Sequence, residues 1–153
     1  MKKRLDYINI APKAINILYS QEAYFQEQFS QSHTMSMTLW ELVKLRVSQI
    51  NQCAFCIDMH SKDAIKMGEK AERIWGLSAW KDMPFYSDAE QVALSWAELL
   101  TAGLPVDDNV YALTLNTFGE EAMVNLTMAI NAINSWNRIV KAFKPQVGAY
   151  QPK

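Results

Sequence analysis

The chain has 153 residues and a formal net charge of −1, with 15 basic and 16 acidic side chains. A balance this even gives no reason to expect nucleic acid or an anionic membrane surface as a partner. Hydrophobic residues make up 50% of the chain and charged residues 20%, which is typical of a folded globular protein and argues against disorder. The length predicts one domain over residues 1–153, long enough to bury a core.

The start of the chain bears on its location in the cell. The stretch MKKRLDYINIAPK carries positive charge, but Asp6, Asn9 and Pro12 interrupt any apolar run behind it, so we expect no signal peptide. No window approaches the roughly 18 apolar residues of a membrane span, and cytoplasm is the expected compartment. There, two cysteines spaced as CxxC are more often redox-active or metal-binding than a structural disulfide.

Apolar residues recur at steps of three and four along most of the chain, which predicts helices. His33 falls in a polar linker at 30–36, and we interpret it as a solvated loop histidine. The tail after Pro145 is expected to be frayed. The fold class is therefore an all-α, single-domain helical bundle. Four expected helices cover residues 12–29, 53–67, 69–80 and 120–143. Three more are expected from their caps: one begins at Ser36 or Thr38 and ends at 50, one begins at Ser87 and ends near 101, and one begins at Asp107 or Asp108 and ends near 118.

The stretch 41–60, ELVKLRVSQINQCAFCIDMH, holds both cysteines of the chain and one of its two histidines. On a helix over 53–67, Cys53, Cys56 and His60 stand at i, i+3 and i+7, and their side chains share one face. Helical Cα atoms three residues apart are separated by about 5 Å, within the usual disulfide range of roughly 4.4–6.8 Å. A dithiol at this place can close and reopen without rebuilding the backbone.

Glu41 is expected near His60. The break at Asn51 and Gln52 is so short that the flanking helices must form an antiparallel hairpin. Since both helices rise about 1.5 Å per residue, residue 41 comes level with residue 61. The rotation of the helices decides whether Glu41 faces His60, and the sequence leaves that open.

These four side chains are suited to thiol redox chemistry. Only the thiolate attacks, and a thiol with a pKa of about 8.5 is mostly protonated at neutral pH. Cys53 would gain from the positive end of the helix dipole, and Cys56 has a proton acceptor one turn away in His60, which Glu41 would orient. Attack on a peroxide gives a sulfenic acid, which the second thiol converts to a disulfide that an external dithiol reduces.

Other interpretations of the cysteines carry less support. Two cysteines and a histidine are three zinc ligands, but a second CxxC or HxxxH is missing, and Cys53 and His60 would lie about 10 Å apart along one helix. A thioredoxin-type site would need a βαβ pattern around the CxxC. No Gly-rich phosphate loop is present, so no organic cofactor is expected. The segment 136–138, Trp-Asn-Arg, is interpreted as packing and hydrogen bonding.

The arrangement Glu41, Cys53, Cys56, His60 follows the pattern E-x11-C-x2-C-x3-H. With it, the chain resembles the AhpD-like alkylhydroperoxidases of the carboxymuconolactone decarboxylase superfamily. Further segments that look like the small members of this family are LSAW at 77–80, FYSDAEQVALSWAELLT at 85–101 and INSWNRI at 133–139. The resemblance covers nearly the whole chain, with a redox core at about 38–101.

The resemblance implies an AhpD-like fold, reduction of a hydroperoxide, and an external dithiol or protein as reductant, without metal or organic cofactor. It implies that Cys56 attacks the peroxide, that Cys53 resolves, and that His60 and Glu41 relay protons. Phe55 departs from the better-studied members, which have a histidine just before the second cysteine. Family members commonly form dimers, trimers or hexamers. Two alternatives stay open: a lactone decarboxylase, and a zinc-stabilised interaction module.

Overall fold

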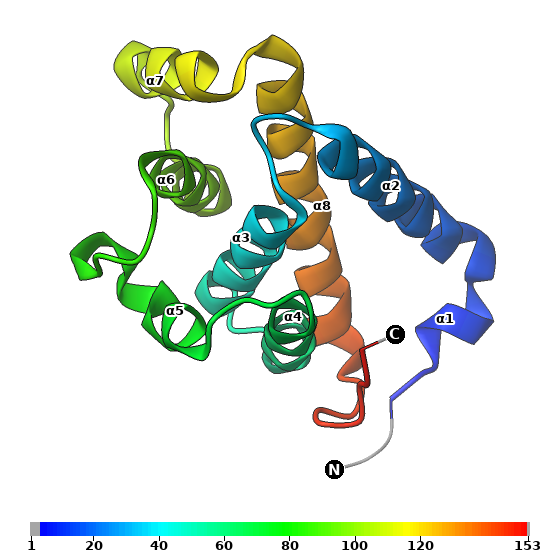
Figure 1. The fold of residues 1–153 in the computed structure, drawn as a ribbon. Helices are drawn as coiled ribbons and strands as arrows, with labels where there is room; N and C mark the ends of the chain where they lie inside the picture. Colours follow the sequence, from blue (N-terminus) through cyan, green and yellow to red (C-terminus); the bar gives the residue numbers. More distant parts are fainter. Residues whose placement is uncertain (1–3, 153) are drawn as a thin grey trace.

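A computed structural model describes residues 4–152 of the chain. Those residues form helices and no strand, which confirms the all-α fold class (Figure 1). None of these helices combines the length and the apolar character that crossing a membrane requires. In chain order the elements are α1 (Tyr7–Ile10), α2 (Pro12–Gln31), α3 (Met37–Ile50), α4 (Ala54–Lys66), α5 (Ala71–Gly76), the 3-10 helix η1 (Leu77–Asp82), α6 (Asp88–Ala102), α7 (Asp108–Phe118) and α8 (Glu120–Phe143).

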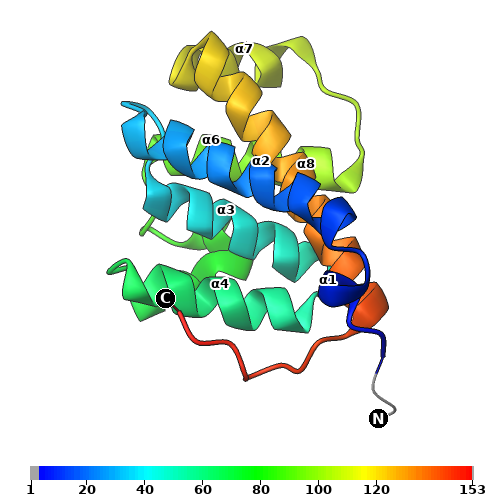
Figure 2. The same ribbon diagram turned by 90° about the vertical axis from the view of Figure 1, so that its right-hand side faces the viewer.

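Helix α3 lies at the centre of the bundle. It packs against α4, α6 and α8, and Figure 2 shows it between α2 on one side and α4 on the other. A helix covered on several sides needs apolar residues around most of its circumference, and α3 provides them at Leu42, Val43, Leu45 and Val47. Buried among these residues are two charged side chains of α3, which matter for the site described below.

The short turn between α3 and α4 is fastened to α8. Gln52 takes a left-handed conformation, with φ at 54°, which reverses the chain between the two helices. The side-chain amide of Asn51 donates to Asn134 and to Asn137 on α8, at 2.9 Å each. Asn137 in turn donates to Ser48 at 3.0 Å. The expected antiparallel hairpin is confirmed, and hydrogen bonds of α8 hold it in place, as interpreted for segment 136–138.

The structure adds the short helix α1, which the sequence did not predict, and it also differs from the expected helices at α4 and over residues 69–80. Helix α4 begins at Ala54, and Cys53 precedes it as the extended N-cap residue, with φ −93° and ψ 92°. The segment expected as one helix over 69–80 is instead divided into α5 and η1, with a non-helical Ala79. The chain then leaves helical geometry at Met83, the C-cap residue of η1, with φ −102° and ψ 132°, because Pro84 disfavours helix in the residue before it.

The end of the chain, expected to be frayed, is docked on α4. Lys62 of α4 donates to the backbone oxygens of Gly148 and Tyr150, at 3.4 and 3.1 Å. The backbone N–H of Gly148 donates to Asp58 at 3.2 Å. Figure 2 shows this segment running along α4 after it leaves the end of α8. The expectation of a frayed tail is therefore wrong for residues 148–150, because a polar face of α4 supplies hydrogen-bond partners for their backbone.

Candidate active site

Cys53 and Cys56 form a disulfide at the start of α4, with their Cα atoms 5.3 Å apart. Each cysteine is 1% exposed, in a small apolar cluster with Phe55 and Val140. Cys53 is the N-cap residue of α4, and its backbone oxygen accepts from Ile57 at 2.9 Å. Because the first N–H groups of a helix have no partner within it, this end carries partial positive charge. The sulfur atoms therefore lie where a thiolate is stabilised once the disulfide is reduced.

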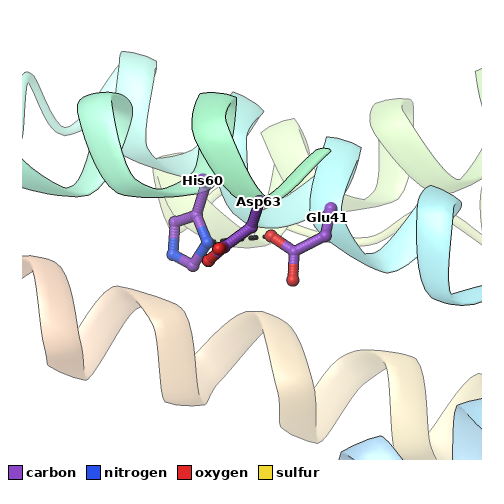
Figure 3. A group of neighbouring side chains, drawn as sticks. All are labelled: Glu41, His60 and Asp63. Atoms are coloured by element: carbon purple, nitrogen blue, oxygen red, sulfur yellow. Dashed lines mark hydrogen bonds and ion pairs between the residues drawn. The ribbon is translucent and has the colours of Figure 1, made fainter. Parts of the chain in front are cut away.

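His60 and Glu41 meet across the hairpin of α3 and α4. Nδ1 of His60 lies 2.9 Å from Oε2 of Glu41, and both side chains are buried. Figure 3 shows the two side chains pointing toward one another from their helices, with the second ring nitrogen on the far side of the ring. That nitrogen, Nε2, is buried and has no hydrogen-bond partner within the described structure. The bond to Glu41 orients the imidazole and leaves Nε2 available to take a proton.

Lys44 holds the other oxygen of the Glu41 carboxylate. It forms an ion pair with Oε1 of Glu41, and its ammonium lies 3.6 Å from the ring centroid of Trp40. Burial opposes ionisation of Glu41, but the hydrogen bond with His60 and the charge of Lys44 outweigh it and hold the pKa of Glu41 below its ordinary value. Glu41 is therefore ionised at neutral pH, although it is only 3% exposed.

Two more carboxylates approach this pair. Glu22 on α2 is half-buried; burial raises its pKa and the charge of Glu41 adds to the increase, while Lys44 and His60 offset part of it. Asp63 lies one turn after His60 on α4, and a carboxylate oxygen of Asp63 lies within 4.8 Å of the facing atoms of His60 and Glu41 (Figure 3). The histidine thus stands among several acidic groups.

The group of Glu41, His60 and Asp63 has the ligand types of a metal site. Its donors already have other partners, since Lys44 pairs with Glu41 and Tyr150 donates to Asp63. Neither cysteine belongs to the group, and the two cysteines are bonded to each other. The zinc hypothesis built on Cys53, Cys56 and His60 therefore finds no support in the geometry of the described residues.

The structure joins the four residues singled out in the sequence in two pairs, Cys53 with Cys56 and His60 with Glu41. It adds four neighbours that the sequence analysis missed, namely Glu22, Lys44, Asp63 and Tyr150. Lys44 follows Glu41 at i+3, and Asp63 follows His60 at the same spacing, so helical periodicity could have found both. Tyr150 comes from the tail and carried no sequence signal. His33, by contrast, lies exposed in the loop after α2, away from these residues in the sequence and on a different element.

The sequence model of the Carboxymuconolactone decarboxylase family matches residues 22–99. The uncharacterized protein YdfG of Bacillus subtilis is 44% identical over 142 residues, which cover 91% of this chain and 92% of YdfG. The uncharacterized protein YnjA of Escherichia coli is 30% identical over 94 residues, or 61% of this chain and 52% of YnjA. The family match contains all of the stretch 41–60.

Solved structures of other proteins resemble this chain as well. ATU0492 from Agrobacterium tumefaciens, a protein of unknown function proposed to be the antioxidant defence protein AhpD, superposes with a TM-score of 0.87 at 34% identity, over 97% of this chain and 100% of that chain. The debrominase Bmp8 has a TM-score of 0.79 at 17% identity, over 93% of this chain and 75% of its own. At that identity the likeness to Bmp8 shows the fold alone.

Proposed function

Because the chain belongs to the carboxymuconolactone decarboxylase family, we propose that it reduces hydroperoxides at the Cys53–Cys56 dithiol. The observation that carries this proposal is the hydrogen bond between His60 and Glu41, at 2.9 Å, one turn beyond a buried cysteine pair. It supplies an oriented imidazole with a vacant nitrogen close in sequence and on the same helix face as Cys56. Similarity to the proposed AhpD protein of Agrobacterium tumefaciens supports the same activity.

The proposed reaction begins with the reduced protein. His60 takes the thiol proton of Cys56 at Nε2, and the thiolate attacks the distal oxygen of the hydroperoxide. The O–O bond breaks, the alcohol leaves with the proton from His60, and Cys56 becomes a sulfenic acid. Cys53 then attacks the sulfenic sulfur, which releases water and forms the disulfide. An external dithiol restores both thiols by exchange, with two electrons passing from the dithiol to the peroxide.

Phe55 affects how efficient this reaction is. The residue occupies the position where better-studied family members have a histidine, and here its side chain packs against the cluster of Cys53, Cys56 and Val140. A phenyl ring excludes water from the sulfur atoms but transfers no proton. We therefore propose that His60 and Glu41 carry the proton transfer without this additional group, at a rate below that of members that have it.

The cysteine pair provides a matched test. With tert-butyl hydroperoxide and dithiothreitol, wild-type protein is expected to consume peroxide continuously. Cys56→Ser abolishes consumption. Cys53→Ser, mixed with the peroxide without dithiothreitol, gives one oxidation event and a sulfenic acid that dimedone traps on Cys56. Wild-type protein whose thiols stay unreactive toward alkyl hydroperoxides, with any of several dithiols as reductant, would overturn the proposal.

The two alternatives predict different results. A lactone decarboxylase would retain its activity when both cysteines are replaced by serine, since that chemistry does not use the dithiol. A zinc-stabilised interaction module would be purified with stoichiometric zinc and would unfold on chelation. The redox proposal predicts a reversible dithiol and no dependence of folding on zinc.

The setting of the reaction is part of the proposal. We propose that the protein acts in the cytoplasm and receives electrons from an external dithiol or protein reductant. Each chain would form one domain over residues 1–153, and two, three or six chains would assemble into a homo-oligomer. Light scattering coupled to size exclusion measures the assembly. A strict monomer at the concentrations used for activity would contradict the oligomer.

A further inference from the structure

Asp63 is a second carboxylate beside the histidine, and the proposed reaction gives it no role. Its carboxylate lies within 4.8 Å of the facing atoms of His60 and Glu41 (Figure 3). Nδ1 of His60 makes its hydrogen bond to Glu41. Asp63 therefore contributes charge at this place rather than a hydrogen bond to the ring. A carboxylate at such a distance favours positive charge on a neighbouring imidazole.

Tyr150 holds this carboxylate in position. Its hydroxyl donates to both oxygens of Asp63, at 2.8 and 3.1 Å. Burial, the hydrogen bond to Asp63 and the charges of Asp63 and Glu41 raise the pKa of Tyr150 to about 12. Tyr150 consequently remains a hydrogen-bond donor at every pH at which the protein would work.

The docked tail determines where the tyrosine hydroxyl lies. Lys62 binds the backbone oxygens on either side of Ala149, and Asp58 accepts from the N–H of Gly148. Lys62 and Asp58 also form an ion pair, at 2.9 Å. The backbone around Tyr150 is thus fixed on the outer side of α4, which places its hydroxyl against Asp63.

The other charged groups around the histidine come from two further helices. Helix α3 contributes Glu41 and Lys44, which neutralise one another in part. Helix α2 contributes Glu22, whose raised pKa reflects its burial. Helix α8 contributes the uncharged Trp136, which hydrogen-bonds to Glu22, and Val140, which contacts the cysteines. Because the positive charge of Lys44 offsets the negative charge of Glu41, Asp63 adds negative charge beside His60 that this ion pair does not neutralise.

We propose that Asp63 and Tyr150 are positioning residues of the redox site, with Tyr150 holding the Asp63 carboxylate where its charge stabilises the imidazolium of His60. The inference rests on the proposed function. When the reduced Cys56 ionises, its proton moves to Nε2 of His60 and the electron pair stays on sulfur, so nothing is oxidised in this step. Asp63 favours the thiolate because it favours the imidazolium that forms with it.

The test measures thiolate formation in the reduced Cys53→Ser protein, where Cys56 is the remaining thiol. The rate of alkylation by iodoacetamide is followed against pH. Asp63→Asn should move the midpoint to higher pH by about one unit, since a charge close to the imidazole is lost. Tyr150→Phe should move it in the same direction by less. The combined variant should match Asp63→Asn alone, because Tyr150 acts through Asp63.

Matched controls are Asp82→Asn and Tyr111→Phe, which remove the same groups at exposed positions and should leave the midpoint unchanged. An unshifted midpoint in Asp63→Asn, or shifts that simply add in the combined variant, overturns the inference. If Asp63→Asn fails to fold, Tyr150→Phe decides alone by the presence or absence of its shift. Alkylation requires no peroxide, so failure of the peroxidase proposal appears separately, as absence of peroxide consumption.

Discussion

The carboxylate of Glu41 and the imidazole of His60 are joined by a hydrogen bond of 2.9 Å across the hairpin of α3 and α4. The same carboxylate binds Lys44 through its other oxygen, so one buried acid holds both a histidine and a cation. If either bond is removed, the His60 or Lys44 side chain that loses it stays buried, where water cannot solvate it, and this costs free energy. The pair therefore links the stability of the bundle to the chemistry proposed for the cysteines.

Replacement of Glu41 by Gln separates these two contributions. It leaves the Lys44 ammonium buried without its carboxylate, and breaking a buried pair in this way costs roughly 3–5 kcal/mol in the free energy of unfolding. Urea unfolding measures that loss. The double variant Glu41→Gln/Lys44→Met should regain most of the stability but not the peroxide consumption, because His60 then faces a neutral amide in place of a carboxylate. Recovery of activity together with stability would show that Glu41 only supports the fold.

Glu22 should make the stability depend on pH in a definite direction. Because its pKa is raised in the folded protein, the neutral form is favoured by folding, and stability is lost as the pH rises through that raised pKa. Glu22→Gln removes this loss. The variant should melt at a higher temperature than wild type at pH 8, and the difference should shrink as the pH falls toward the ordinary carboxyl pKa of about 4.3.

The matched control for that comparison is Glu27→Gln, an exposed residue of the same helix, which should leave the melting temperature nearly unchanged at both pH values. A Glu22→Gln variant that is less stable than wild type at pH 8 would contradict this prediction. It would mean that the negative charge of Glu22 stabilises the fold, for example through its attraction to Lys44.

Asn137 is the amide through which α8 holds the turn before Cys53. It is fully buried, accepts from Asn51 and donates to Ser48. Asn137→Ala leaves these partners unsatisfied, and we expect a loss of about 1–3 kcal/mol in the free energy of unfolding. Asn131→Ala, exposed on the same helix, is the control. Equal stability of the two variants would contradict the role given to Asn137.

Replacement of Phe55 by His tests whether the missing relay group limits the rate. The new imidazole would lie in the first turn of α4, next to Cys56, and we expect peroxide consumption to rise by about tenfold, a modest contribution for a general acid or base. Phe55→Leu keeps the site apolar and should not raise the rate. A Phe55→His variant no faster than Phe55→Leu would show that proton transfer at this position is not limiting.

Much of the site could be predicted because it lies on helices with fixed rise and periodicity. Helical spacing alone puts Cys56 and His60 on one face, and the two-residue break at Asn51 and Gln52 brings residue 41 level with His60. The rotation of α3 about its axis could not be predicted, since it depends on how several helices pack together. The structure sets that rotation so that Glu41 points at the ring.

Other features depend on contacts between segments far apart in the sequence. Tyr150 reaches Asp63 because Lys62 and Asp58 capture the backbone of the tail, and nothing in the tail sequence indicates this partner. The sequence predicts Cys53 as the first residue of a helix, whereas in the structure Cys53 is the extended residue that precedes α4. Periodicity does not determine at which residue a helix begins. Here the turn at Gln52 determines that α4 begins after Cys53.

The central claim is that Cys53, Cys56, His60 and Glu41 form one peroxide-reducing site. A single-turnover experiment tests it most directly: reduced protein is mixed with one equivalent of tert-butyl hydroperoxide, and both thiols and the intact mass are followed. We predict that one peroxide is consumed per chain, that both thiols disappear as the Cys53–Cys56 disulfide forms, and that His60→Gln slows the reaction by about 100-fold or more. Peroxide consumption that leaves both thiols free, or a His60→Gln variant as fast as wild type, would contradict the account.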